Sequence, residues 1–79
     1  MPRVRYFAQA KEATGTRAEE LPGATVAEVL AAAVARHGSA LEEVLERAAV
    51  WVDGEPAGPD EPVGADAEVA VLPPVSGGG

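Results

Sequence analysis

Apolar and polar residues alternate along three stretches of the chain, residues 2–8, 49–53 and 68–72. A period of two is typical of a β-strand that buries one of its faces. The positions that share the inward face are Val4, Tyr6, Ala8, Val50, Val52, Val69 and Val71. The outward face carries Phe7, Trp51 and Leu72 together with Arg3, Arg5 and Ala70. We therefore expect three strands whose inward residues form one core.

Turn residues predict two further strands. Residues 17–21 are expected to return beside the first strand across a loop at residues 11–16, which contains a glycine. Asp53-Gly54 is a strong signal for a tight turn, and we expect a brief strand around Pro56 after it. Residues 59–66 are rich in Pro, Gly and Asp, which predicts a loop before the last strand.

A helix is predicted over residues 26–37, where apolar residues recur at spacings of three and four. Thr25 and the glutamate three residues later form a capping box at its start, and Gly38 supplies a left-handed end. A second capping pattern at Ser39 predicts a shorter helix over residues 41–47. The apolar stripe of the main helix consists of Val26, Val29, Leu30, Ala33, Val34 and His37.

This order of elements predicts an α+β fold, in which one main helix crosses one face of a small mixed sheet. The 79 residues allow one domain. We assign that domain to residues 1–74 and a flexible C-terminal glycine tail to residues 75–79.

The residue types exclude several kinds of chemistry. The chain has no cysteine and one histidine, His37, so it offers no disulfide, no thiolate site and no set of soft metal ligands. It also lacks a Ser-His-Asp arrangement and a glycine-rich phosphate loop. We expect neither a bound metal nor catalysis by this chain alone. His37 is interpreted as a structural residue near a helix C-terminus.

Thirteen acidic and six basic residues give a net charge of -7. This balance argues against nucleic acid or an anionic membrane as a partner, and it favours a basic protein. The N-terminus lacks the layout of a secretory signal, and the apolar runs are short. We expect a cytoplasmic protein.

Two features favour a binding function. If the predicted strands lie side by side, Phe7, Trp51 and Leu72 form a contiguous exposed apolar patch, which usually marks a partner surface. The alternative is that these are scattered surface residues.

The second feature is the segment 73–79, in which two prolines are followed by a narrow glycine-rich end. These seven residues reach about 23 Å when extended, enough to thread a carboxylate into another protein's active site. The composition of this segment alone favours the alternative, a frayed terminus.

Five segments resemble one known family. They are Val4-Arg5-Tyr6-Phe7-Ala8-Gln9-Ala10-Lys11-Glu12, Thr25-Val26-Ala27-Glu28-Val29-Leu30, Val52-Asp53-Gly54, Asp66-Ala67-Glu68-Val69-Ala70-Val71 and Leu72-Pro73-Pro74-Val75-Ser76-Gly77-Gly78. On these segments the chain resembles the small subunit of molybdopterin synthase, a ubiquitin-like β-grasp sulfur carrier. The resemblance implies that an activating enzyme uses ATP and magnesium to adenylate the terminal glycine. Sulfur then converts it to a thiocarboxylate, which donates sulfur to a pterin precursor in molybdenum cofactor biosynthesis.

The resemblance also implies partners and site residues. The partners are the activating enzyme and the synthase large subunit, in a heterotetramer, and no cofactor is bound to this chain. Phe7 and Leu72 match the family's docking patch, and Lys11 matches a basic position near it. The remaining expected partner-binding residues are Pro73, Pro74 and Val75 of the tail and Trp51, whose place rests on strand geometry alone.

The family motif is complete at Gly78, yet the chain continues to Gly79. We assign the reactive carboxylate to Gly79 because it is the actual end, with Gly78 as the alternative. Three other functions remain open: a sulfur carrier for thiamine or cysteine synthesis, a ubiquitin-like protein modifier, and an interaction module with an inert tail.

Overall fold

The structure, a computed structural model, describes residues 1–74. These residues contain five strands and three helices. In chain order they are β1 (Arg3–Tyr6), α1 (Ala8–Thr14), β2 (Ala18–Glu20), α2 (Val26–His37), α3 (Ser39–Leu45), β3 (Ala49–Val52), β4 (Glu55–Pro56) and β5 (Glu68–Leu72). Within this part of the chain no helix is long and apolar enough to cross a membrane.

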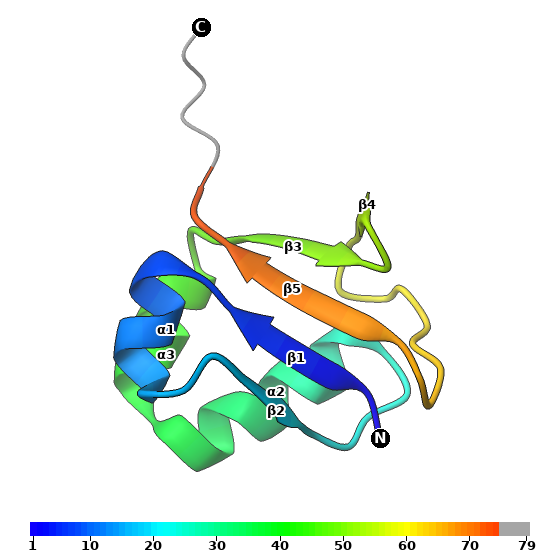
Figure 1. Ribbon diagram of the computed structural model, residues 1–79, viewed down its shortest axis with the longest axis horizontal. Coiled ribbons are helices and arrows are strands. Elements are labelled where there is room, and N and C mark those ends of the chain that lie inside the picture. Colours follow the sequence, from blue (N-terminus) through cyan, green and yellow to red (C-terminus); the bar gives the residue numbers. More distant parts are fainter. Residues whose placement is uncertain (75–79) are drawn as a thin grey trace, which may run out of the picture.

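The five strands form one mixed sheet in the order β2-β1-β5-β3-β4. The central strands β1 and β5 run parallel, and every other neighbouring pair is antiparallel. Figure 1 shows α2 crossing behind the sheet and α1 beside α3 at one end of it. The predicted α+β fold of the ubiquitin-like β-grasp type is confirmed, and α1 is the one helix of the described residues that was not predicted.

The core lies between the sheet and α2, and it is built from the inward positions of the strands. Val4, Val69 and Val71 are fully buried, as is Val29 on the facing side of α2. Burying one such side chain contributes roughly 1.5–3 kcal/mol relative to leaving it in water. The apolar positions of the alternating pattern, which predicted the strands, are therefore the residues that form the core between the sheet and α2.

Helix α2 has the predicted bounds, and its caps explain both ends. Thr25 Oγ1 accepts a 3.2 Å hydrogen bond from the amide of Glu28, as the capping box predicts. The reciprocal bond differs, because Glu28 Oε1 accepts from the amide of Ala24 at 3.0 Å, one residue before the expected partner. At the other end Gly38 adopts a φ of 89° and a ψ of -165°, which stops the helix without the predicted left-handed helical turn.

The first strand is shorter than predicted. It ends at Tyr6, and Ala8 opens helix α1 where we expected the end of a strand and then a loop at residues 11–16. Ala8 has a φ of 50°, which turns the chain out of the sheet. Ala10 is buried against the core at 1% exposure. Because α1 packs against the core through alanine, no large apolar residues recur along it at helical spacing. The sequence pattern therefore did not predict this helix.

The bounds of the second predicted helix also differ from the prediction. Helix α3 spans Ser39–Leu45 rather than residues 41–47. Gly38 is its N-cap, so Ser39 lies inside the helix and does not cap it.

The predicted turn at Asp53-Gly54 is confirmed. Both residues have positive φ, 49° and 86°, the combination that lets a two-residue turn join β3 to β4.

Candidate functional site

Parallel pairing brings the ends of β1 and β5 to the same edge of the sheet. Tyr6 pairs with Val71, and the amide of Phe7 continues the ladder by donating a 3.1 Å hydrogen bond to the carbonyl oxygen of Val71. The register thus sets Phe7 beside Leu72, the last residue of β5. The exposed prolines Pro73 and Pro74 follow directly. The chain leaves the sheet next to Phe7.

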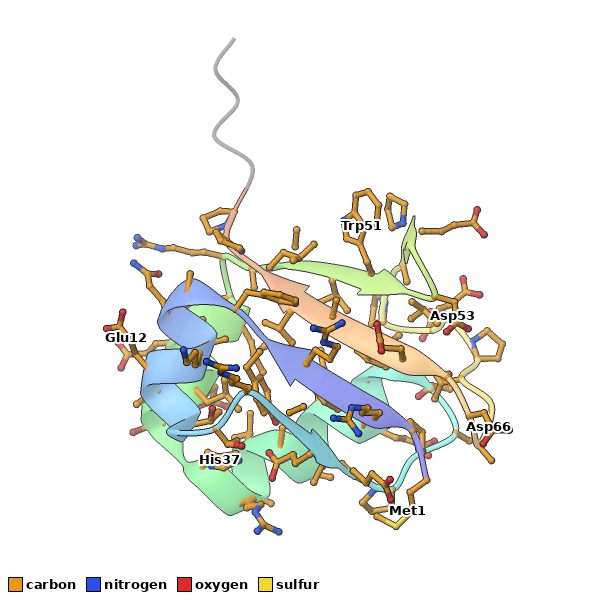
Figure 2. The ribbon with its side chains drawn as sticks, in the orientation of Figure 1. Met1, Glu12, His37, Trp51, Asp53 and Asp66 are labelled. Atoms are coloured by element: carbon orange, nitrogen blue, oxygen red, sulfur yellow. The ribbon has the colours of Figure 1, made fainter. Side chains whose placement is uncertain are left out.

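Trp51 shares the outward face but lies one row further along the sheet. Its cross-strand partners are Ala70 on β5 and Pro56 on β4, while Ala49 stands opposite Leu72. Trp51 and Leu72 are therefore diagonal neighbours, at a separation that an aromatic side chain can bridge. Figure 2 shows Trp51 on β3 at the side of the β4 hairpin.

The expected apolar patch is less exposed than predicted. Phe7, Trp51 and Leu72 are each half-buried, and Met1 is the only large apolar residue within 1–74 that is mostly exposed, at 60%. One reason is Arg5, whose guanidinium carbon lies 5.4 Å from the centroid of the Phe7 ring. A cation over an aromatic face is attracted to it, so Arg5 covers part of this ring.

A hollow of about 340 Å³ opens beside Phe7. Three basic side chains line it. Arg5 lies on β1, Lys11 lies on α1, and Arg17 directly precedes β2. The amide of Tyr6 donates a 2.8 Å hydrogen bond to the carbonyl oxygen of Arg17, which fixes that residue near the end of β1. We call this site the basic hollow; it is lined by Arg5, Tyr6, Phe7, Ala8, Lys11 and Arg17.

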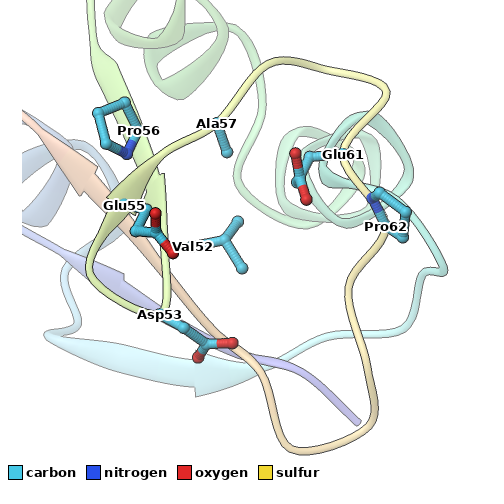
Figure 3. A pocket seen from close by; sticks show the side chains of 7 residues that line it. All are labelled: Val52, Asp53, Glu55, Pro56, Ala57, Glu61 and Pro62. Atoms are coloured by element: carbon cyan, nitrogen blue, oxygen red, sulfur yellow. The ribbon is translucent and has the colours of Figure 1, made fainter.

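A second hollow, of about 250 Å³, lies between the β3–β4 hairpin and the following loop. Figure 3 shows Asp53, Glu55 and Glu61 around it, with Val52 between them. We call it the acidic hollow. Within the described residues, no group of three or more His, Cys, Asp or Glu side chains could hold a metal ion. The acidic hollow therefore concentrates negative charge without forming a metal site.

Glu19 organises a polar cluster on the helix-covered side of the sheet. The Tyr6 hydroxyl donates a 2.6 Å hydrogen bond to Glu19 Oε2, and His37 Nε2 contacts the same oxygen. Arg36 Nε lies 3.1 Å from the other carboxylate oxygen. The rings of Tyr6 and His37 meet edge to face with centroids 5.9 Å apart. His37, labelled in Figure 2, thus ties the end of α2 to β2, in keeping with a structural role.

This cluster shifts two pKa values. Burial raises the pKa of the Tyr6 hydroxyl well above its ordinary value, and the neighbouring Glu19 carboxylate raises it further. Burial also opposes ionisation of Glu19, but the hydrogen bonds from Tyr6 and His37 and the charge of Arg36 outweigh it and lower the pKa of that carboxyl below 4.5. Glu19 is therefore ionised at neutral pH, where it binds Tyr6 and His37 by hydrogen bonds and Arg36 as an ion pair.

The structure brings Phe7, Leu72 and Lys11 together at the base of the tail, and Trp51 lies on the same face further along. Val75, Gly78 and Gly79 fall outside the described residues, so these three assignments remain predictions. The sequence interpretation did not identify Arg17 as a neighbour of Lys11. The available signal was the alternation that sets Arg5 on the face of Phe7, but the convergence of the cations depends on where α1 and β2 lie.

The chain was compared with known proteins. Residues 4–78 match the model of the ThiS family, which is nearly the whole chain. A search of curated proteins gave no match.

Several solved structures are more than 25% identical to this chain. The small archaeal modifier protein SAMP1 from Haloferax volcanii is 35% identical, with a TM-score of 0.78 over 98% of each chain. A putative molybdopterin converting factor subunit 1 from Pyrococcus furiosus is 28% identical, with a TM-score of 0.76 over 94% of this chain and 97% of that one.

A third structure shares the fold at lower identity. It is the complex of subunits 1 and 2 of the molybdopterin-converting factor from Helicobacter pylori, with a chain that is 22% identical at a TM-score of 0.69. The match covers 98% of this chain and 97% of that one. The same fold thus occurs in a chain solved together with its partner subunit.

Proposed function

Because the chain belongs to the ThiS family of ubiquitin-like sulfur carriers, we propose that it is the sulfur-carrying small subunit of a molybdopterin synthase. The observation that carries this proposal is the position of Phe7 beside Leu72, directly before the Pro-Pro-Val-Ser-Gly-Gly-Gly end. A docking surface at the point where the chain leaves the sheet suits a carrier whose end enters another protein. The 28% identity to the Pyrococcus furiosus converting factor subunit supports the same pathway.

The proposed reaction begins at the terminal carboxylate, which is a poor electrophile until one oxygen becomes a leaving group. A carboxylate oxygen of Gly79 attacks the α-phosphorus of ATP, and diphosphate leaves. A sulfide sulfur then attacks the acyl carbon, and AMP departs with the former carboxylate oxygen, which leaves a thiocarboxylate. ATP and magnesium belong to the activating enzyme, and the pterin precursor belongs to the large subunit.

The folded domain contributes position rather than chemistry. Phe7 and Leu72 form the central part of the proposed docking face, with Trp51 further along it. Pro73 and Pro74 have fixed φ angles and no amide hydrogen, so they neither extend the sheet nor fold back onto it by hydrogen bonding. The proposed assembly with a large subunit is supported by the shared fold of a chain in the Helicobacter pylori complex.

Intact-mass measurement tests the carrier step. The chain is incubated with an adenylating enzyme of this family, ATP, magnesium and a sulfide source. We expect a mass gain equal to the exchange of one oxygen for one sulfur, located at the last residue by fragmentation. Adding the large subunit and the pterin precursor should return the mass to its starting value.

The control for this experiment is a chain that lacks Gly78 and Gly79, which should fold normally and gain no mass. Fragmentation also decides whether sulfur resides on Gly79 or, after trimming, on Gly78. If the activating enzyme converts its own carrier but leaves this chain unchanged, the carrier function is wrong. If the chain gains sulfur but retains it with the large subunit and precursor present, the pathway is wrong.

A second candidate function is supported by the 35% identity to a protein named as a modifier. A modifier would join its terminal carboxyl group to lysine amines of other proteins through an amide bond. Lys11 is the single lysine of this chain, so several self-linkages are impossible. Glycine remnants on target lysines, found by mass spectrometry in cells expressing the chain, would favour this function over sulfur transfer to a pterin.

A further inference from the structure

The charges of this acidic chain are unevenly distributed. Its net charge is -7, yet three of its six basic residues line the basic hollow: Arg5, Lys11 and Arg17. Acidic residues line the acidic hollow, at the β3–β4 hairpin. The chain as a whole attracts cations, but its surface near Phe7 presents the opposite sign.

Two of these three cations are uncompensated within residues 1–74. Neither Lys11 nor Arg17 lies within ion-pair distance of a carboxylate there, and both are exposed. Arg5 has a partner, Glu68, at 3.5 Å, but both side chains are 48% exposed. An exposed pair of this kind contributes little stability, so Arg5 can exchange its partner at small cost.

The position of the hollow links these charges to the tail. Phe7 forms part of its wall and also stands beside Leu72, where the chain leaves the sheet. A protein that takes up the tail and packs on Phe7 has a surface that faces Arg5, Lys11 and Arg17. Any carboxylate of that protein near Phe7 would meet three positive charges.

We propose that the basic hollow is the docking site for an acidic segment of the partner that takes up the C-terminus, with Asp or Glu side chains next to an apolar residue. The apolar residue packs on Phe7 and the carboxylates face the three cations. The proposal rests on the proposed function only in that a partner takes up the tail. It reverses, at this surface, the basic partner that the net charge favours.

An acidic protein segment fits the hollow better than other anions. A nucleic acid would carry its many phosphates across a chain of net charge -7 and be repelled outside the hollow. Free phosphate has no apolar part to use the ring of Phe7. Charge complementarity at such a surface raises the association rate more than it slows dissociation, and salt weakens it.

Titration of the 15N-labelled full chain by NMR tests the site directly. The probe is the peptide acetyl-Leu-Asp-Glu-Asp-Leu-amide, with acetyl-Leu-Asn-Gln-Asn-Leu-amide as its neutral counterpart and inorganic phosphate as a third arm. We expect the acidic peptide to shift the amides of Phe7, Lys11 and Arg17 at low salt. The neutral peptide and phosphate should shift them much less.

Two matched variants assign the effect to the hollow. Arg17→Gln removes a cation that lines it, whereas Arg3→Gln removes an exposed arginine of β1 that does not. Loss of one exposed charge pair is worth a factor of about two to five. We expect the peptide to bind Arg17→Gln more weakly by that factor and Arg3→Gln unchanged. Equal shifts with the neutral peptide or phosphate, or equal weakening in both variants, would overturn the proposal.

The outcome is separable from that of the proposed function. A chain that gains sulfur from the activating enzyme but shows no preference for the acidic peptide is a carrier without this docking site. A chain that binds the peptide through Arg17 but gains no sulfur has the site and a different function.

Discussion

The amide of Phe7 donates a hydrogen bond to the carbonyl oxygen of Val71, and this bond joins the C-terminal ends of β1 and β5. It is a backbone contact, so it survives replacement of the aromatic ring. The position of residue 7 beside Leu72 is therefore set by the fold, and the side chain there is free to serve binding.

Replacing the ring tests that separation. In Phe7→Ala we expect thiocarboxylation at limiting chain concentration to fall about five- to thirtyfold, the range for losing a central aromatic contact of an interface. Because Phe7 is only half-buried, the urea midpoint should change little. Unchanged thiocarboxylation with an intact fold would remove Phe7 from the docking face.

Ala8 has a strained backbone conformation, so the free energy of unfolding should depend on which residue replaces it. A left-handed backbone costs an alanine about 1–2 kcal/mol, and a β-branched residue more. We expect Ala8→Gly to hold or raise the free energy of unfolding and Ala8→Val to lower it by about 2 kcal/mol. Urea unfolding of both variants measures this. A tolerated valine would contradict the positive φ of 50°.

Gly23 and Gly64 form a matched pair. A Cβ on Gly23 would lie 2.7 Å from both Cγ2 and the amide nitrogen of Val29, whereas a Cβ on Gly64 would meet nothing within 4 Å. Gly23→Ala should therefore lower the free energy of unfolding by about 1–3 kcal/mol. Gly64→Ala, measured in the same denaturant series, should stay within about 0.5 kcal/mol of the parent. Equal effects would show that the start of α2 yields to the added methyl group.

Glu19 should make the domain acid-sensitive. Its pKa is lower in the folded state than the ordinary 4.5, so its contribution to stability is present above that value and disappears as the pH falls through the folded pKa. At pH 7 we expect Glu19→Gln to cost about 1.5–3 kcal/mol, because a charged acceptor of several hydrogen bonds is lost.

The pH dependence distinguishes this cause from a general loss of packing. Between pH 5 and pH 3 the parent should lose more stability than Glu19→Gln, as measured by urea unfolding at each pH. The neighbouring exposed Glu20 is the control, and Glu20→Gln should follow the parent. A parallel decline in Glu19→Gln would mean that the carboxylate is not the titrating group.

The alternation of the sequence predicted β1, β3 and β5, because valines on these strands alternate with residues on the uncovered face. The recurring apolar spacing and the Thr25 cap likewise predicted α2 to the residue. Helix α1 was missed since it packs through Ala10 and Ala13, which carry too little apolar surface to show a period. In each case the size of the buried side chain decided what could be predicted.

Only part of the candidate site could be predicted from the sequence. Phe7 and Leu72 could be predicted because Leu72 ends β5, and Phe7, in extended backbone, continues the alternation of β1 by one residue. The basic hollow could not, since Lys11 lies on the helix that was missed and Arg17 lies on the segment that follows it. Lys11 and Arg17 come together because the chain turns at Ala8, which has a positive φ. The residue type alanine does not predict a positive φ.

The parallel pairing of β1 with β5 also has a consequence for the order of folding. β5 is the central strand of the sheet, paired with β1 on one side and β3 on the other, and it spans residues 68–72, far along the chain from β1. Contacts between distant parts of a chain form slowly, because a long loop must close first. A growing polypeptide therefore cannot complete this sheet until β5 has been synthesised. Residues 73–79 follow β5 directly, so they are joined to a finished proposed docking face only after β5 has paired with β1 and β3.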